Sequence, residues 1–172
     1  MQGYVLTGLR VLVVEKQLFM RRLLGDVMRQ LGIRNVVKVA NIREGVEVIS
    51  KHDFDLVLLD WAPDMDAVKF LSTVRSAEAS RNPFIPVIVV TAYSEHKRVC
   101  EARDAGMTEY LIKPISAQAL YARIKATIER HRKFIKTGSF FGPDRRRRDG
   151  APPGGERRKY RPPAQNVSGQ NV

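Results

Sequence analysis

Short runs of apolar residues alternate along the chain with longer segments in which apolar residues recur every three or four positions. The short runs are typical of buried strands, and the longer segments are typical of helices with one apolar face. The pattern therefore predicts five strands, each followed by a helix. We expect strands near residues 9–14, 35–39, 55–60, 86–91 and 109–112, and helices near residues 17–30, 42–51, 66–78, 95–105 and 116–135.

The predicted strands are almost continuously apolar, as in Val11–Val14 and Leu56–Leu59. Such strands are typical of a parallel sheet that is covered by helices on both faces. The first predicted helix has an apolar stripe that includes Leu23 and Val27, and Gly32 is suited to ending it. With right-handed crossovers between strands, the expected fold class is α/β, with a doubly wound five-stranded parallel sheet.

Polar residues stand at the carboxyl ends of three predicted strands. Glu15 follows the first strand, Asp60 ends the third, and Lys113 follows the fifth. Ligands of open parallel α/β sheets bind outside these carboxyl ends, so we expect the three side chains to converge on one small site. Two carboxylates beside an ammonium group suit the binding or transfer of an anionic group.

Charge is distributed unevenly along the 172 residues, which carry a formal net charge of +12. Residues 132–172 contain 11 Lys or Arg against 3 Asp or Glu, and they are rich in Pro and Gly with few aliphatic residues. Such a segment cannot bury enough apolar surface to offset the entropy of ordering. We therefore expect an N-terminal extension at 1–8, a folded domain at 9–131 and a flexible basic tail at 132–172.

The chain has one cysteine, Cys100, in a segment that we expect to be helical. One cysteine excludes both a disulfide within the chain and a cysteine-rich metal site. No stretch approaches the ~20 consecutive apolar residues of a membrane span, and the first residues do not resemble a secretion signal. We expect a cytoplasmic protein without a membrane span.

Several motifs together resemble the receiver domains of two-component response regulators, close to the single-domain chemotaxis type, across roughly residues 8–130. The motifs are the acidic position after Val11–Val14, the Asp60-Trp61 pair after an apolar run, the segment Val87–Ala92, and Tyr110–Pro114. The resemblance implies a CheY-like, flavodoxin-like sheet with strand order 2-1-3-4-5.

The resemblance also implies that Asp60 accepts a phosphoryl group from a phosphohistidine on a sensor histidine kinase or a phosphotransfer protein. Lys113 would pair with the phosphoryl oxygens, and Thr91 would donate a hydrogen bond to them. Such a protein catalyses only its own modification. Lys113-Pro114 corresponds to a cis peptide of the family, which helps to aim the lysine.

The residue Tyr110 matches the family's switch aromatic, which turns inward when the Thr91 loop moves. The movement would reshape the face built from helix four, strand five and helix five, which would bind a downstream protein. Receivers often pair through this face, so a homodimer is also implied. The plain alternative is that Tyr110 is a strand aromatic with its hydroxyl group in water. Trp61 is expected to be a partly exposed loop aromatic near the mouth of the site.

The family holds Mg²⁺ in its acidic site, and the resemblance assigns this role to Glu15, Asp60 and the backbone carbonyl of Ala62. Two departures affect this assignment. Lys16 stands where the family has a second acidic ligand, and an ammonium group there removes a ligand and adds repulsion. The loop after Asp60 is also one residue shorter than usual and lacks its glycine.

Lys16 leaves two alternatives open. Its ammonium group could lie ~4 Å from Asp60, where the interaction would be worth roughly 4 kcal/mol before desolvation. The chain would then be a pseudo-receiver, an adaptor that works without phosphorylation. Alternatively, Lys16 points to solvent on its long stem, and Glu15 with Asp60 still binds a metal weakly.

The tail contains two similar basic motifs, Gly142–Arg147 and Gly154–Lys159. Two copies on a flexible chain predict bivalent binding to an acidic protein surface, with Phe140-Phe141 inserting into an apolar groove. We expect Phe134 and Ile135 to continue the last helix toward them. The rival partner is nucleic acid, bound non-specifically through its phosphates, which would make the chain a nucleic-acid-associated protein. A solvated basic extension is the plain alternative.

Overall fold

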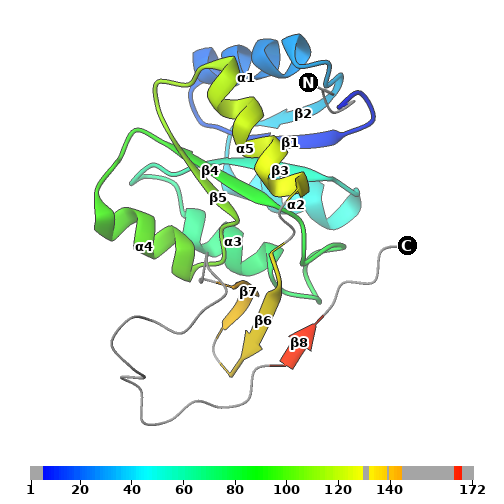
Figure 1. The fold of residues 1–172 in the computed structure, drawn as a ribbon, viewed down its shortest axis with the longest axis vertical. Coiled ribbons are helices and arrows are strands. Elements are labelled where there is room, and N and C mark those ends of the chain that lie inside the picture. Colours follow the sequence, from blue (N-terminus) through cyan, green and yellow to red (C-terminus); the bar gives the residue numbers. More distant parts are fainter. Residues whose placement is uncertain (1–5, 130–131, 139, 145–164, 168–172) are drawn as a thin grey trace.

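A five-stranded parallel sheet forms the centre of the computed structural model, which describes residues 6–129, 132–138, 140–144 and 165–167 (Figure 1). Its strand order is β2-β1-β3-β4-β5, so the predicted fold class and strand order are confirmed. The strands are β1 (Arg10–Val14), β2 (Asn35–Val39), β3 (Leu56–Asp60), β4 (Val87–Thr91) and β5 (Glu109–Ile112).

Helices cover both faces of this sheet (Figure 1). Each strand contributes alternate residues to the two faces. Val11 and Val13 pack in one apolar cluster with α1 (Leu18–Gln30) and α5 (Ala117–Glu129). Leu12 and Val14 belong to the cluster on the other face. That face is covered by α2 (Ile42–Lys51), α3 (Ala67–Val74) and α4 (His96–Asp104). Within the described ranges, none of the helices has the length and apolarity that crossing a bilayer requires.

Backbone pairing continues past the ends of the strands and fixes the segments that follow them. The N–H of Glu15 donates to the carbonyl of Val39, and the N–H of Lys113 donates to the carbonyl of Thr91 at 2.7 Å. Trp61 donates in the same way to Val90. The first residue beyond each of three strands is therefore held by the sheet before the chain turns into a loop.

Two helices end where local geometry requires it. Gly32 follows α1 with φ +84°, and the N–H groups of Gly32 and Ile33 bond back to the last turn of the helix, which confirms the predicted cap. The predicted extension of α3 to residue 78 is wrong, because the helix ends at Val74. The next residue, Arg75, turns its side chain into the protein interior.

The structure differs most from the prediction in the segment that follows α5. α5 ends at Glu129, and the segment that was expected to continue it to residue 135 instead enters strand β6 (Phe134–Thr137). β6 pairs antiparallel with β7 (Phe140–Pro143) on one edge and with β8 (Gln165–Val167) on the other. The expected flexibility is therefore wrong for residues 132–138 and 140–144. The second basic motif and residues 145–147 of the first lie outside the described residues, as do residues 1–5 of the expected N-terminal extension.

Aromatic packing explains why the β6–β7 hairpin is ordered. The ring centroids of Phe84 and Phe134 are 5.0 Å apart, and those of Phe84 and Phe141 are 5.3 Å apart, both edge to face. Such pairs add to the burial of the rings themselves. Phe141, which was expected to insert into a partner's groove, thus packs against its own chain.

A buried arginine lies beneath this hairpin. Arg75 donates hydrogen bonds to the carbonyls of Gly106, Pro83 and Ile85 at 3.0, 2.8 and 2.7 Å, and its guanidinium lies 5.2 Å from the ring centroid of Phe134. Burial lowers the pKa of Arg75 to about 9, whereas the carbonyl acceptors and the ring stabilise its charged form. Because Phe84 precedes β4 and Gly106 precedes β5, the hairpin covers the amino ends of these strands.

The substitution Phe134→Ala should lower the free energy of unfolding by about 1–3 kcal/mol, because it removes a half-buried ring from the aromatic cluster. Phe19→Ala is the matched control, since Phe19 is 74% exposed, and it should change stability by less than about 0.5 kcal/mol. Urea unfolding of both variants measures the difference. Equal stabilities would show that the hairpin contributes nothing to folding.

Candidate functional site

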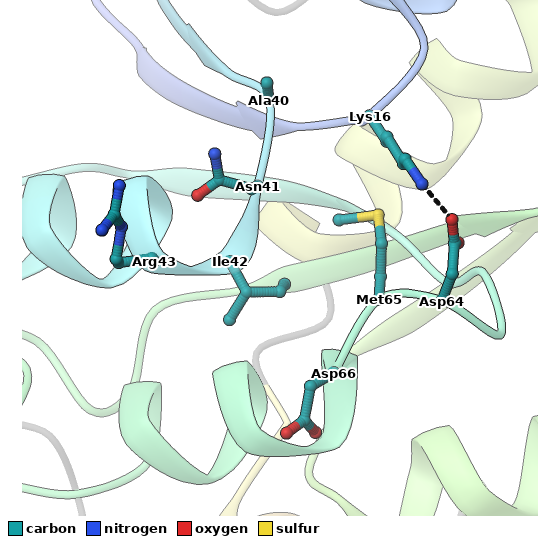
Figure 2. Close-up of a pocket in the computed structure, with 8 residues that line it drawn as sticks. All are labelled: Lys16, Ala40, Asn41, Ile42, Arg43, Asp64, Met65 and Asp66. Atoms are coloured by element: carbon teal, nitrogen blue, oxygen red, sulfur yellow. Dashed lines mark hydrogen bonds and ion pairs between the residues drawn. The ribbon is translucent and has the colours of Figure 1, made fainter.

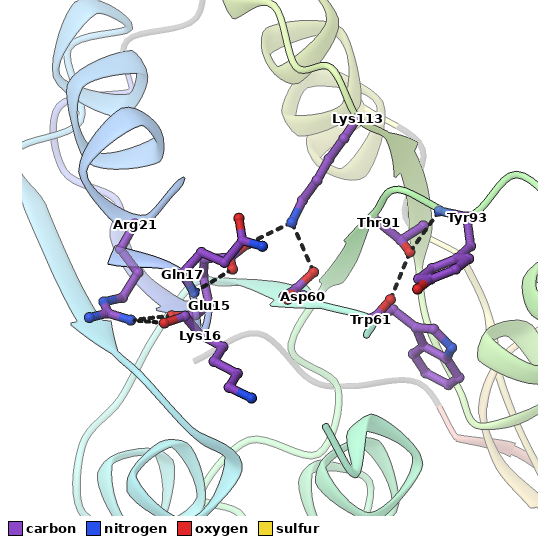
Figure 3. A network of polar contacts seen from close by, with 9 residues as sticks. All are labelled: Glu15, Lys16, Gln17, Arg21, Asp60, Trp61, Thr91, Tyr93 and Lys113. Carbon is purple, nitrogen blue, oxygen red and sulfur yellow. Dashed lines mark hydrogen bonds and ion pairs between the residues drawn. The ribbon is translucent and has the colours of Figure 1, made fainter. Parts of the chain in front are cut away.

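The three polar residues predicted to converge do lie together at the carboxyl ends of the strands (Figure 3). The Nζ atom of Lys113 is 2.8 Å from Oε2 of Glu15 and 3.0 Å from Oδ1 of Asp60. Glu15 comes from the end of β1, Asp60 from the end of β3, and Lys113 from the end of β5. The cis Lys113-Pro114 peptide lies at the start of the segment that leaves the site.

Burial makes the charges of this site interdependent. The side chains of Glu15, Asp60 and Lys113 are only 1%, 7% and 17% exposed. Burial raises the pKa of Asp60, the neighbouring carboxylate of Glu15 raises it further, and Lys113 opposes both. Burial alone would lower the pKa of Lys113, but its hydrogen bonds to Glu15 and Asp60 leave it above the ordinary value. The ammonium group of Lys113 is therefore the charge that opposes protonation of Asp60.

The loop after β1 is fixed by contacts that the sequence did not reveal. Oε1 of Glu15 accepts a hydrogen bond from the N–H of Gln17 at 2.9 Å. The guanidinium of Arg21 donates to the carbonyls of Glu15 and Lys16 at 2.7 and 2.6 Å. The acceptors of Arg21 are backbone atoms, which leave no pattern of residue types in a sequence. Arg21 could have been found only from its place on the first turn of α1.

Lys16 points away from Asp60 and forms an ion pair with Asp64 in the loop after β3 (Figures 2 and 3). Both side chains are more than half exposed. The direction of Lys16 matches the second alternative above, with a partner that the sequence did not suggest. A pseudo-receiver was expected to have the ammonium group of Lys16 on Asp60. In the described part of the chain, Lys16 instead pairs with Asp64, and Asp60 pairs with Lys113.

The ion pair borders a pocket of about 620 Å³ between the loops after β1, β2 and β3 (Figure 2). Two helices begin at this pocket, each with a side-chain cap. Asn41 accepts from the N–H of Glu44 at 2.9 Å, and Asp66 accepts from the N–H of Lys69 at 3.1 Å. The lining residues are Lys16, Ala40, Asn41, Ile42, Arg43, Asp64, Met65 and Asp66.

A chain of hydrogen bonds leads from the site toward β5. The hydroxyl group of Thr91 donates to the carbonyl of Trp61 at 2.7 Å and accepts from the N–H of Tyr93 at 3.2 Å. The carbonyl of Tyr93 in turn accepts from the hydroxyl of Tyr110 at 2.6 Å. Tyr110 is buried, so the alternative that places its hydroxyl in water is wrong. Trp61, expected to be partly exposed, is also buried.

The predicted donor set for Mg²⁺ is not assembled. The carbonyl of Ala62 accepts the N–H of Met65 at 3.0 Å and so belongs to a turn of its own loop. Glu15 and Asp60 share the ammonium group of Lys113, and Lys16 replaces the remaining acidic ligand. Among the described residues, no three His, Cys, Asp or Glu side chains are grouped in a way that could hold a metal ion. The residues present therefore do not fit the expected Mg²⁺ ion.

Comparison with known proteins shows a match to the response regulator receiver domain family over residues 11–125. The chain is 30% identical over 123 residues to the chemotaxis protein CheY of Pseudomonas aeruginosa, across 71% of this chain and 98% of that protein. It is 28% identical over 131 residues to the chemotaxis protein CheY-3 of Vibrio cholerae, across 76% and 99%. A CheY-like receiver domain protein from Methanospirillum hungatei is structurally similar, with a TM-score of 0.61 and 25% identity, across 70% of this chain and 93% of that one.

The substitution Lys113→Met should raise the pKa of Asp60. Lys113 lowers this pKa, whereas burial and Glu15 raise it, so removal of the ammonium group leaves only the raising effects. As pH falls, Asp60 would then lose its negative charge at a higher pH than in the unaltered chain. Titration of the Asp60 carboxyl carbon by NMR measures the change. Lys16→Met is the matched control and should leave this titration unchanged, since Lys16 pairs with Asp64.

Proposed function

Since the chain belongs to the response regulator receiver domain family of two-component signalling, we propose that Asp60 accepts a phosphoryl group from a phosphohistidine and thereby switches protein contacts. The observation that supports this most directly is the ion pair between Lys113 and Oδ1 of Asp60. In this pair a buried carboxylate and a positive charge lie side by side at the carboxyl end of a central strand, as the proposed transfer requires.

In the proposed reaction, the protein has to position the Asp60 carboxylate and supply positive charge near the phosphoryl group. Oδ2 of Asp60, which lies outside the ion pair, attacks the phosphorus atom. The P–N bond to the partner's histidine breaks as the P–O bond forms, and the imidazole leaves with the electron pair of the broken bond. The ammonium group of Lys113 balances the charge on the transferred oxygens, which is the principal catalytic effect in phosphoryl transfer.

The hydrogen-bond chain through Thr91 offers a route from this reaction to the surface. A phosphoryl group on Asp60 would compete with the carbonyl of Trp61 for the hydroxyl of Thr91. If Thr91 moves, Tyr93 moves with it, and the bond between Tyr93 and Tyr110 is altered. The result is a shift in population between two arrangements of the α4–β5–α5 face, where a downstream protein would bind.

The surface around the site supports docking of a phosphohistidine-bearing protein, either a sensor kinase or a phosphotransfer protein. Large apolar side chains are exposed where chains leave the carboxyl ends of β1, β3, β4 and β5. Exposed apolar groups that form a continuous patch are typical of an interaction surface, and we propose such a patch around Asp60. These residues are Leu18, Phe19, Val68, Tyr93 and Ile112.

Incubation of the purified chain with phosphoramidate, with and without Mg²⁺, should add one phosphoryl group that intact-mass measurement detects. Asp60→Asn should abolish the gain because it removes the nucleophile. Asp53→Asn is the matched control, since Asp53 lies in the loop before β3 and pairs with Arg81. A chain that gains no phosphoryl group under any condition would instead be a phosphorylation-independent adaptor.

Thr91→Ala should still permit phosphorylation but should uncouple it from Tyr110, because the hydroxyl group that links the two is missing. Thr91→Ser keeps a hydroxyl at this position and should preserve the coupling. NMR signals of the Tyr110 ring, recorded before and after phosphorylation, distinguish the variants. Equal shifts in both would mean that the route does not pass through Thr91.

A further inference from the structure

Two loops flank Asp60, and in this chain an ion pair joins them. Lys16 follows the buried Glu15 in the loop after β1, and Asp64 lies in the loop after β3. Figure 2 shows the ammonium group of Lys16 directed at the Asp64 carboxylate, and both residues line the pocket. The pair therefore connects the same two loops that supply the expected metal donors, Glu15 on one side and the Ala62 carbonyl on the other.

Other contacts fix these loops independently of any bound ion. Arg21 holds the carbonyls of Glu15 and Lys16, and the N–H of Gln17 holds Oε1 of Glu15. On the other side, the N–H of Met65 bonds to the carbonyl of Ala62 and closes a turn. Both loops thus have defined conformations that rest on the chain's own donors and acceptors.

The charges of the site also disfavour a divalent cation. Mg²⁺ requires near-octahedral oxygen ligands and gives up its waters reluctantly. Glu15 has one oxygen bonded to Gln17 and the other to Lys113, so a metal ion on Glu15 would have to lie close to the ammonium group of Lys113. Lys16 stands in the loop after β1 where the family carries an acidic ligand, so one negative charge for a cation is missing.

We propose that the Lys16–Asp64 ion pair takes the place of the divalent cation as the link between the two loops, so that Asp60 is phosphorylated without Mg²⁺. Lys113 provides the positive charge at Asp60, and Lys16 holds the loop after β1 to the loop after β3. Lys16 is in this sense a positioning residue. The inference rests on the proposed phosphorylation of Asp60, and its test includes a measurement that does not depend on that reaction.

The first measurement is Mg²⁺ titration of Trp61 fluorescence. Trp61 is the single tryptophan of the chain and follows Asp60 directly, so an ion at the site would change its emission. The unaltered chain should show no saturable change, and Lys16→Asp should gain one. Lys16→Gln removes the charge without restoring a ligand, and it should resemble the unaltered chain. Both substitutions are at an exposed position and should leave the fold intact.

The second measurement compares phosphorylation rates with phosphoramidate in EDTA and in Mg²⁺. The unaltered chain should react at rates within about twofold of each other, whereas Lys16→Asp should be slower in EDTA by about tenfold or more, as expected for a reaction that needs a metal. Saturable Mg²⁺ binding by the unaltered chain that Asp60→Asn abolishes would overturn the inference. If no variant gains a phosphoryl group, the proposed function fails, and the fluorescence titration still decides whether Lys16 excludes the ion.

Discussion

One ammonium group bound to two buried carboxylates is the interaction on which the site depends. Lys113 leaves β5 and crosses the end of β4 to reach Asp60 on β3 and Glu15 after β1. Without this charge, two buried carboxylates would face each other, and Glu15 would raise the pKa of Asp60 unopposed. The arrangement therefore ties together three strands whose ends must keep their relative positions for the site to exist.

Much of this arrangement follows from elementary rules. Runs such as Val11–Val14 reveal buried strands, and parallel strands bring their carboxyl ends to one edge, so the meeting of Glu15, Asp60 and Lys113 could be expected. The partner of Lys16 could not, because a long flexible side chain on the surface can reach several acids. The pairing with Asp64 depends on the path of a shortened loop, which residue types do not specify.

The hairpin shows a different limit of sequence interpretation. Residues 132–144 are polar and basic on average, and averages predict flexibility. The segment has few aromatic residues. However, Phe134 and Phe141 pack against Phe84, and Phe134 also packs against the buried Arg75. Phe84 and Arg75 belong to distant parts of the chain. Order here arises from long-range contacts between isolated aromatic residues, and such contacts leave no local periodicity.

Because of the hairpin, the folded unit extends further along the chain than the segment that matches the family. The match to the family ends at residue 125, whereas the hairpin that covers Arg75 continues to Asp144, whose N–H bonds to the carbonyl of Lys133. Excision of the domain at the homology limit would uncover a desolvated guanidinium group and the ring of Phe84. A fusion of this receiver to another protein would thus have to include the hairpin, because the hairpin is part of the fold.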